Sequence, residues 1–217
     1  MKTTRLPEAS GPACRHHDTG LSILGIGEST IAGVGVPDLD QALTARIADG
    51  LAGQSGHSVS WDAFGQNGDR LKDLLEKHQA LPPRKFDAVI VAVGVNDVTG
   101  LTSLLRWSQQ ILELTTKLKE MYDAPICFCS VPPMHLFTAL PQPLRFALGM
   151  RARMLDEILR STAEVSPGVY YLESEFQPHE QYLAQDGYHP SERGYQVWGE
   201  LVAKQLSALL KDNPDKK

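Results

Sequence analysis

The sequence is poor in cysteine, lacks a basic stripe and has no long apolar run, and each lack excludes a class of protein. Its 3 cysteines cannot all pair with one another, so a disulfide framework is not expected. A net charge of −5 argues against electrostatic binding to nucleic acid or to an anionic membrane. No run approaches the roughly 18 apolar residues of a membrane span. We therefore expect a soluble, cytoplasmic protein.

The length and composition are those of one ordinary globular domain. The chain has 217 residues, of which 42% are hydrophobic and 22% are charged, and it contains no repeats or low-complexity blocks. Residues 1–20 carry charge but lack the apolar core of a signal peptide, and we expect them to form a flexible leader. Residues 21–211 are expected to form a single domain, and residues 212–217 a frayed tail.

Short apolar runs alternate with longer amphipathic segments along the domain. Strands are expected at about 21–26, 58–63, 86–93, 125–131 and 169–172, and helices at about 38–53, 69–80, 102–121, 144–163 and 191–211. The third strand is almost wholly apolar, as in a central parallel strand that is covered on both faces. Five alternations predict a doubly wound α/β domain with a five-stranded parallel sheet, in the strand order 2-1-3-4-5.

Two of the cysteines lie in the expected fourth strand, in the run Ile126–Cys129. Cys127 and Cys129 are two residues apart, so both point to the same face of the sheet. Buried thiols are a better interpretation than a metal site, because no second cysteine or histidine pair has ligand spacing. Cys14 lies in the leader. We expect no metal and no cofactor.

A glycine-rich stretch, residues 25–33, follows the first expected strand and contains Ser29. Open α/β sheets bind ligands at the carboxyl ends of their strands, which is where this hydroxyl falls. Ser29 is therefore a candidate nucleophile. Alternatively, it caps a helix after a simple strand-to-helix turn, and the stretch alone supports the two interpretations equally.

A serine nucleophile needs a base and a group that orients the base, and the end of the chain offers both. In Asp186-Gly187-Tyr188-His189-Pro190, the carboxylate lies three residues before the histidine. It can meet one imidazole nitrogen within a single turn and leave the other nitrogen free. Pro190 disfavours a helical backbone at His189 and suits the start of the next helix.

Two further strand ends offer hydrogen-bond donors for an oxyanion. Gly68 follows the second strand and can present a bare backbone N–H, and Asn96 follows the third strand and can present its side-chain amide. Glycine and asparagine are also common turn residues. The coincidence of these groups with Ser29 and His189 at one sheet edge favours the catalytic interpretation.

A proline-rich and apolar segment, residues 131–143, follows the fourth strand. Proline discourages regular structure there. Met134, His135, Leu136 and Phe137, with Leu140, could form the wall of an apolar substrate pocket. Ordinary packing or a subunit contact is an equally weighted alternative.

These blocks resemble those of the SGNH (GDSL-type) serine hydrolases over roughly residues 21–210. The resemblance rests on Gly27-Glu28-Ser29, Gly68, Gly94-Val95-Asn96-Asp97 and Asp186 with His189, in the family's order and approximate spacing. It implies a flavodoxin-like three-layer α/β/α fold. It also implies Ser29 as nucleophile, His189 as base, Asp186 as its orienter, and the Ser29 N–H, the Gly68 N–H and the Asn96 amide as oxyanion donors.

One residue departs from the family's pattern. The first block usually reads Gly-Asp-Ser, and here Glu28 replaces the aspartate. The added methylene must change the hydrogen bonds around the loop, and it could alter loop order or substrate preference. Glu28 and Val95 are further candidates for the substrate pocket.

The resemblance predicts a carboxylic ester hydrolase that acts on a small-molecule ester with a short acyl chain or an aryl group. A lysophospholipase, a thioesterase or a carbohydrate O-acetylesterase would use the same core. A nucleotide- or ligand-binding module without catalysis is the alternative of another class, and a metal phosphoesterase built from Asp97, Asp186 and His189 is a further one. A nucleophile elbow is excluded, because Gly-x-Ser-x-Gly would need glycine where Ile31 stands.

Overall fold

The computed structural model describes residues 5–137, 139–173 and 179–211. Its strands are β1 (Cys14–Arg15), β2 (Leu21–Gly27), β3 (Val59–Gly65), β4 (Ala88–Ala92), β5 (Ile126–Cys129) and β6 (Val169–Leu172). Its α-helices are α1 (Leu43–Ser55), α2 (Leu71–Lys77), α3 (Val95–Thr99), α4 (Leu104–Met121), α5 (Leu144–Val165) and α6 (Glu192–Lys211). Short 3₁₀ turns lie at Leu39–Gln41, His78–Ala80, Met134–Leu136 and Glu180–Tyr182.

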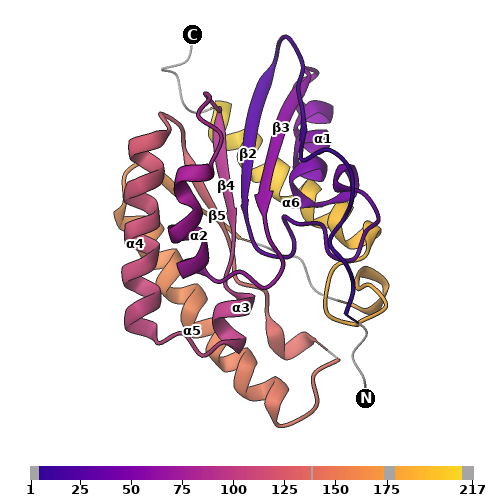
Figure 1. The fold of residues 1–217 in the computed structure, drawn as a ribbon, viewed down its shortest axis with the longest axis vertical. Helices are drawn as coiled ribbons and strands as arrows, with labels where there is room; N and C mark the ends of the chain where they lie inside the picture. The colour runs from indigo at the N-terminus through magenta and orange to yellow at the C-terminus, as the bar shows by residue number, and fades with distance from the viewer. Residues whose placement is uncertain (1–4, 138, 174–178, 212–217) are drawn as a thin grey trace.

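The strands form one sheet in the order β1-β3-β2-β4-β5-β6 (Figure 1). The strands from β2 to β6 are parallel and follow the predicted order. The prediction of a five-stranded, wholly parallel sheet is wrong in one respect, because the described residues add β1 antiparallel to β3. A strand of 2 residues has no periodicity that a sequence pattern could reveal.

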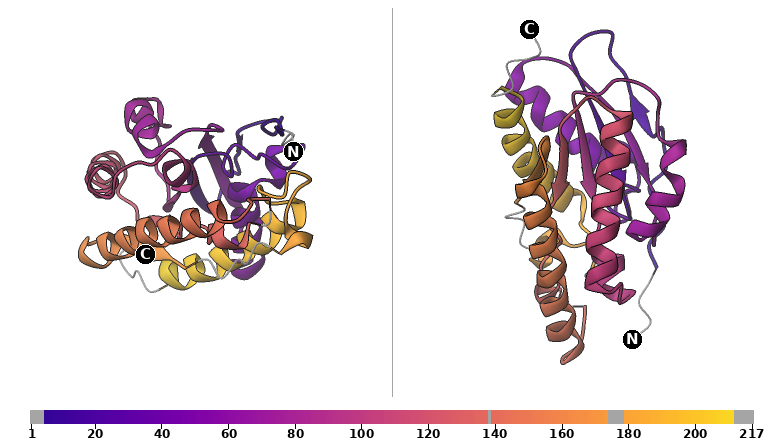
Figure 2. Two further views of the ribbon diagram at one scale, coloured as in Figure 1. Left: turned by 90° about the horizontal axis from the view of Figure 1, so that it is seen from below. Right: turned by 90° about the vertical axis from the view of Figure 1, so that its left-hand side faces the viewer.

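Helices cover both faces of the sheet, which gives three layers (Figure 2). Alternate residues of each central strand enter different cores, as the pleat of a strand requires. Val89 and Val91 pack with the helices α2, α4 and α5, whereas Ile90 packs with α1 and α6. The predicted three-layer α/β architecture is therefore confirmed.

Cys127 and Cys129 lie on one face of β5, in the core beneath α1 and α6. Both are buried and unpaired, as predicted. Burial raises the pKa of the Cys129 thiol to about 12, so the thiol stays protonated at neutral pH. None of the helices among the described residues is long and apolar enough to cross a membrane.

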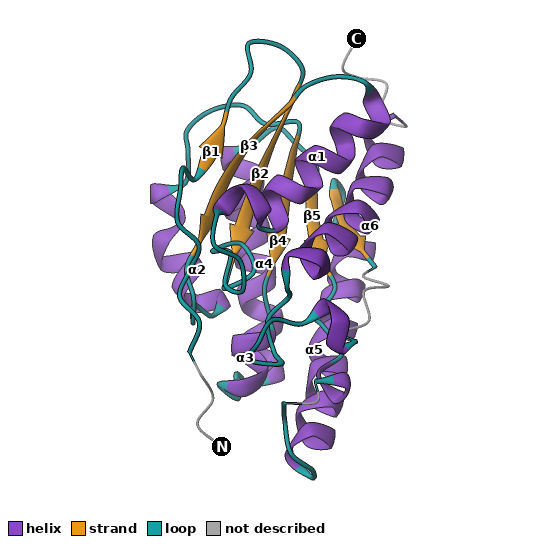
Figure 3. Ribbon diagram, turned by 90° about the vertical axis from the view of Figure 1, so that its right-hand side faces the viewer, coloured by secondary structure: helices purple, strands orange, loops and turns teal. Residues whose placement is uncertain are grey.

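Part of the predicted leader lies along the edge of the sheet (Figure 3). Cys14 and Arg15 form β1 beside β3, and the Ala9 N–H donates to Ala32 O at 3.0 Å. The Glu8 carboxylate accepts the Asn67 N–H at 2.6 Å, in the loop that follows β3. The leader thus contacts both the strand β3 and a loop at the carboxyl end of the sheet. The flexibility of the leader stays a prediction.

Candidate active site

The strands β2, β3 and β4 end side by side. Gly27 pairs with Gly65 on β3 and with Ala92 on β4. A Cβ atom on Gly27 would lie 2.2 Å from Ala92 O, so only glycine allows the strands to meet this closely. The residues that follow these three strands therefore reach one edge of the sheet, where open α/β folds bind their ligands.

Ser29 lies in a tight turn directly after β2. The Glu28 carbonyl accepts the N–H groups of Ile31 and Ala32 at 3.0 and 3.1 Å. The turn does not lead into a helix, because α1 begins only at Leu43. Ser29 is therefore not a helix cap, and the capping alternative is wrong.

The hydroxyl and the backbone N–H of Ser29 are not engaged by the described part of the chain, whereas its carbonyl accepts the Val34 N–H at 2.9 Å. The residue is only 7% exposed. Within residues 5–137, 139–173 and 179–211, neither its N–H nor its Oγ makes a hydrogen bond. An enclosed hydroxyl beside an unpaired N–H is suited to attack a carbonyl and to bind the oxyanion that forms.

Asp186 and His189 make the contact that their spacing predicts. His189 Nδ1 lies 2.6 Å from Asp186 Oδ2, while Asp186 Oδ1 accepts the backbone N–H groups of Tyr188 and His189 at 3.0 Å each. Burial raises the pKa of Asp186, but these hydrogen bonds outweigh it and hold the pKa below its usual value. The carboxylate thus stays ionised and fixes the ring, with Nε2 left for another partner.

The loop after Ser29 packs against the junction that carries His189. A Cβ on Gly35 would lie 2.3 Å from Pro190 O, and the buried Tyr195 hydroxyl donates to Val34 O at 2.7 Å. No hydrogen bond between Ser29 Oγ and the His189 ring occurs among the described residues. Such bonds are often long before substrate binds.

Gly68 and Asn96 lie on the neighbouring strand ends. Gly68 has φ +89°, which favours glycine, and its N–H donates no hydrogen bond within the described chain. The Asn96 side-chain amide donates to Asp69 O at 3.0 Å, which ties the loop after β4 to the loop after β3. This hydrogen bond fixes the orientation of the Asn96 side chain.

Asp97 serves the scaffold. It is 1% exposed, and its carboxylate accepts the Leu71 N–H at 2.9 Å and the Thr102 hydroxyl at 2.6 Å. It thus fixes the start of α2 against α3. Asp97 does not group with Asp186 and His189 among the described clusters of possible metal ligands.

Glu28 binds the amino end of α3. Its two carboxylate oxygens accept the N–H groups of Val95 and Asn96 at 2.9 and 3.0 Å. The longer side chain in place of aspartate therefore connects the turn that contains Ser29 to the loop that carries Asn96. Burial raises the pKa of the carboxyl to about 8, and the two N–H donors lower it only in part.

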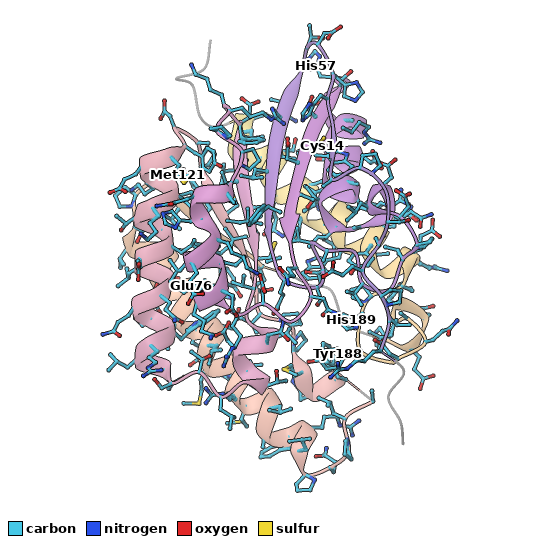
Figure 4. All side chains as sticks on the ribbon, viewed as in Figure 1. Cys14, His57, Glu76, Met121, Tyr188 and His189 are labelled. Atoms are coloured by element: carbon cyan, nitrogen blue, oxygen red, sulfur yellow. The ribbon has the colours of Figure 1, made fainter. Side chains whose placement is uncertain are left out.

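A cavity of about 480 Å³ opens beside His189, whose position near Tyr188 is labelled in Figure 4. It is lined by Arg5, Leu6, Asn67, Gly68, Ala139, Leu140, Asp186, Tyr188 and His189. The candidate base His189, its carboxylate partner Asp186 and the candidate oxyanion donor Gly68 thus share one cavity. A volume of this size fits a small molecule.

Of the predicted pocket residues, Leu140 lines this cavity and the others do not. Met134 and Phe137 are buried in the core, and the Phe137 ring meets the Tyr188 ring edge-on at 5.0 Å. His135 is exposed, Leu136 and Val95 are partly buried, and Glu28 is buried in its hydrogen bonds. The proline-rich segment contributes Ala139 and Leu140 instead. The 3₁₀ turn at Met134–Leu136 directs the earlier apolar residues inward, which composition alone could not reveal.

Arg5 and Leu6 are cavity residues that sequence reasoning missed. They precede the domain in the chain and belong to no recognisable motif. Their place depends on contacts far away in sequence, such as those of Glu8 and of β1.

Comparison with known proteins identifies relatives over most of the chain. The sequence profile of the GDSL-like lipase/acylhydrolase family matches residues 26–197. A GDSL-like esterase of Mycobacterium tuberculosis is 26% identical over 199 residues, which is 87% of this chain. The match spans 62% of that relative's length, so the relative is considerably longer.

Solved structures share the fold at low identity. A family 3 carbohydrate esterase of Clostridium thermocellum has a TM-score of 0.69 at 20% identity, with 88% of this chain and 97% of that chain covered. A lipolytic protein of the G-D-S-L family from Desulfitobacterium hafniense has a TM-score of 0.65 at 19% identity, with 85% and 99% covered. An acetylxylan esterase of Geobacillus stearothermophilus has a TM-score of 0.62 at 17% identity, with 87% and 94% covered.

Proposed function

Because the chain belongs to the GDSL-like lipase/acylhydrolase family, we propose that it is a carboxylic ester hydrolase with Ser29 as its nucleophile. The observation that carries the proposal is the 2.6 Å contact between Asp186 and His189 at the wall of a cavity that Gly68 also lines. An ionised carboxylate on Nδ1 leaves Nε2 as the acceptor of the serine proton.

The reaction is acyl transfer from an alcohol to water. Ser29 Oγ attacks the ester carbonyl while His189 Nε2 takes its proton. Asp186 stabilises the imidazolium, since hydrogen bonds hold the pKa of Asp186 below its usual value. His189 then protonates the leaving alcohol, and the acyl group stays on Ser29. Water repeats the sequence and releases the acid.

The oxyanion is held by three donors from three strand ends. The N–H groups of Ser29 and Gly68 have no acceptor within the described residues, which makes them suitable donors. The Asn96 amide supplies the third, with its orientation fixed by Asp69 O at 3.0 Å. Donors that are placed in advance cost no reorganisation when the charge develops.

A carbohydrate O-acetylesterase is the second candidate, and it differs only in the alcohol part of the ester. It is supported by the likeness in fold to the family 3 carbohydrate esterase and to the acetylxylan esterase. Release of acetate from acetylated xylo-oligosaccharides, compared with p-nitrophenyl acetate, distinguishes the two candidates.

The test of the mechanism is hydrolysis of p-nitrophenyl acetate and butyrate by single variants. Ser29→Ala is expected to abolish hydrolysis and labelling by a fluorophosphonate. Asn96→Ala is expected to lower kcat about a hundred- to a thousandfold, because one oxyanion donor is lost.

Ser207→Ala is the matched control, since Ser207 is also buried but lies in α6. It should keep full activity and labelling. Circular dichroism and thermal melts check that each variant folds. Undiminished hydrolysis by a folded Ser29→Ala protein would overturn the proposal.

A further inference from the structure

A cluster of three potential metal ligands lies on the edge of the sheet, away from the cavity beside His189. Cys14, His16 and Asp62 each offer one ligand atom, and these atoms all lie within 4.8 Å of one another. Figure 4 labels Cys14 beside β3, toward the end of that strand opposite to His189. The sequence predicted no metal site, because Asp62 is far from Cys14 along the chain.

Sheet geometry explains why the three side chains meet. Cys14 on β1 is directly paired with Asp62 on β3, so both point to the same face. His16 lies two residues after Cys14 and points the same way. The intervening Arg15 points to the other face, where its guanidinium lies 5.9 Å from the centre of the Trp61 ring.

The distances fit a tetrahedral ion without a change of backbone. His16 Nε2 lies 3.4 Å from Asp62 Oδ1. Nitrogen and oxygen ligands at the usual zinc distances of about 2.0–2.2 Å are themselves about 3.4 Å apart in a tetrahedron. In the same tetrahedron, a sulfur ligand about 2.3 Å from the ion lies roughly 3.6 Å from each of the other two ligand atoms. The three ligand atoms of this cluster already lie within 4.8 Å of one another, so the Cys14 thiolate needs at most a small shift.

The surroundings of Asp62 hold the carboxylate in place. Asp62 is 9% exposed, and its Oδ2 forms an ion pair with Arg84. Arg84 in turn donates to Ser22 Oγ at 2.7 Å. Such an outer contact orients a ligating carboxylate. Both carboxylate oxygens face His16, whose Nε2 lies 3.1 Å from Oδ2 and 3.4 Å from Oδ1. A thiolate, a carboxylate and a neutral imidazole carry two negative charges, which match a divalent cation.

We propose that Cys14, His16 and Asp62 bind a zinc-type divalent cation that fastens the amino-terminal segment to β3. Mixed sulfur, nitrogen and oxygen ligands suit Zn²⁺, with water in the fourth position. Binding displaces the thiol proton of Cys14 to solvent. The ion would stabilise an edge pairing of only 2 residues on β1, and with it the segment that brings Arg5 and Leu6 to the cavity.

The test uses the full chain without a histidine tag, after treatment with a chelator. Titration with Co²⁺ should give a thiolate-to-cobalt charge-transfer band and tetrahedral d–d bands that saturate at one ion per chain. Calorimetry with Zn²⁺ should give the same stoichiometry, and Zn²⁺ should raise Tm. Cys14→Ser and His16→Ala should each weaken binding more than about a hundredfold, since even an outer contact is typically worth ten- to a hundredfold.

His17→Ala is the matched control, because His17 is the exposed neighbour whose backbone N–H, and not its ring, contacts Ser60 Oγ at 2.9 Å. It should bind like the wild type. Absence of the charge-transfer band, or equal binding by Cys14→Ser, would overturn the proposal. These measurements of metal binding do not depend on ester hydrolysis, so they test the metal site independently of the proposed function.

Discussion

Glu28 is a buried acid that links the turn containing Ser29 to α3. Its carboxylate accepts the N–H groups of Val95 and Asn96, while burial raises its pKa to about 8. An ordinary glutamate in the unfolded chain has a pKa of 4.5. Between these two values the folded protein keeps a proton that the unfolded chain has lost. Unfolding therefore releases a proton, and the free energy of unfolding falls as the pH rises.

We predict that Glu28→Gln removes this part of the pH dependence, because glutamine does not titrate. In the wild type the contribution of Glu28 is fully present below about pH 4.5 and is lost as the pH rises to about 8. Its slope is at most about 1.4 kcal/mol per pH unit. Urea unfolding of the wild type and the variant at pH 5, 6.5 and 8 measures this pH dependence of the free energy of unfolding.

Glu76→Gln is the control for this experiment, because Glu76 is exposed on α2 (Figure 4). It should leave the pH profile unchanged. The other titrating groups are common to the wild type and both variants. Their contributions therefore cancel when the free energies of unfolding are subtracted. A Glu28→Gln profile parallel to that of the wild type would contradict the assignment.

At the scale of elements, the packing of α1 on α6 places the last loop. A Cβ on Gly199 would lie 2.5 Å from Arg46 Cβ and 3.0 Å from Ile47 N, so the two helices approach through this glycine. α6 begins just after His189-Pro190, and its Tyr195 donates to the loop that follows Ser29. A shift of α6 would therefore move His189 relative to Ser29.

We predict opposite effects for two glycine-to-alanine changes on these helices. Gly199→Ala should lower the free energy of unfolding by about 1–3 kcal/mol, because the added methyl group meets the backbone of α1. Gly53→Ala on α1 should raise it by about 0.4–1 kcal/mol, because nothing lies within 4 Å of the added atom. Urea unfolding of both variants measures the difference, and shifts of the same sign would contradict the packing argument.

The elements differ in how far the sequence could define them. The strand β4 was expected close to where it lies because all of its residues are apolar. The helices α4, α5 and α6 were expected because their amphipathic periodicity extends over many residues. β1 and α3 were not expected. They have 2 and 5 residues, and they depend on β3 and on the Glu28 carboxylate rather than on a pattern of their own.

At the scale of the molecule, four separate stretches of chain form the cavity. The leader supplies Leu6, the loop after β3 supplies Asn67 and Gly68, the proline-rich segment supplies Leu140, and the last loop supplies His189. Apolar groups form the larger part of this wall, and charged or polar groups form the rest, so the limit on a ligand is the size of the cavity. A cavity of about 480 Å³ with such a wall suits a short acyl group better than a long one.

We therefore predict that kcat/KM for p-nitrophenyl esters is highest for acetate or butyrate. It should fall at least about tenfold by the decanoate, because the outer methylenes do not fit into a cavity of about 480 Å³ and crowd its rim instead of gaining the roughly 0.8 kcal/mol per buried CH₂. The full chain-length series measures this dependence, with the Ser29→Ala protein as the background. A kcat/KM that rises through the long chains would contradict it.

The sequence by itself determined the layers of the fold, because apolar periodicity is a local property of each strand and helix. The predicted order of the parallel strands was the usual topology for five such alternations, and the structure has it. It also determined the contact of Asp186 with His189, since a separation of three residues closes within one turn. The catalytic roles of these residues stay predictions.

Only the tertiary structure decided which side chains line the cavity and which meet at the edge of the sheet. Met134 and Phe137 are as apolar as Leu140, yet they are buried in the core while Leu140 lines the cavity. Cys14 and Asp62 meet only because β1 pairs with β3. Such outcomes depend on contacts between segments that are distant in sequence, and no local pattern encodes them.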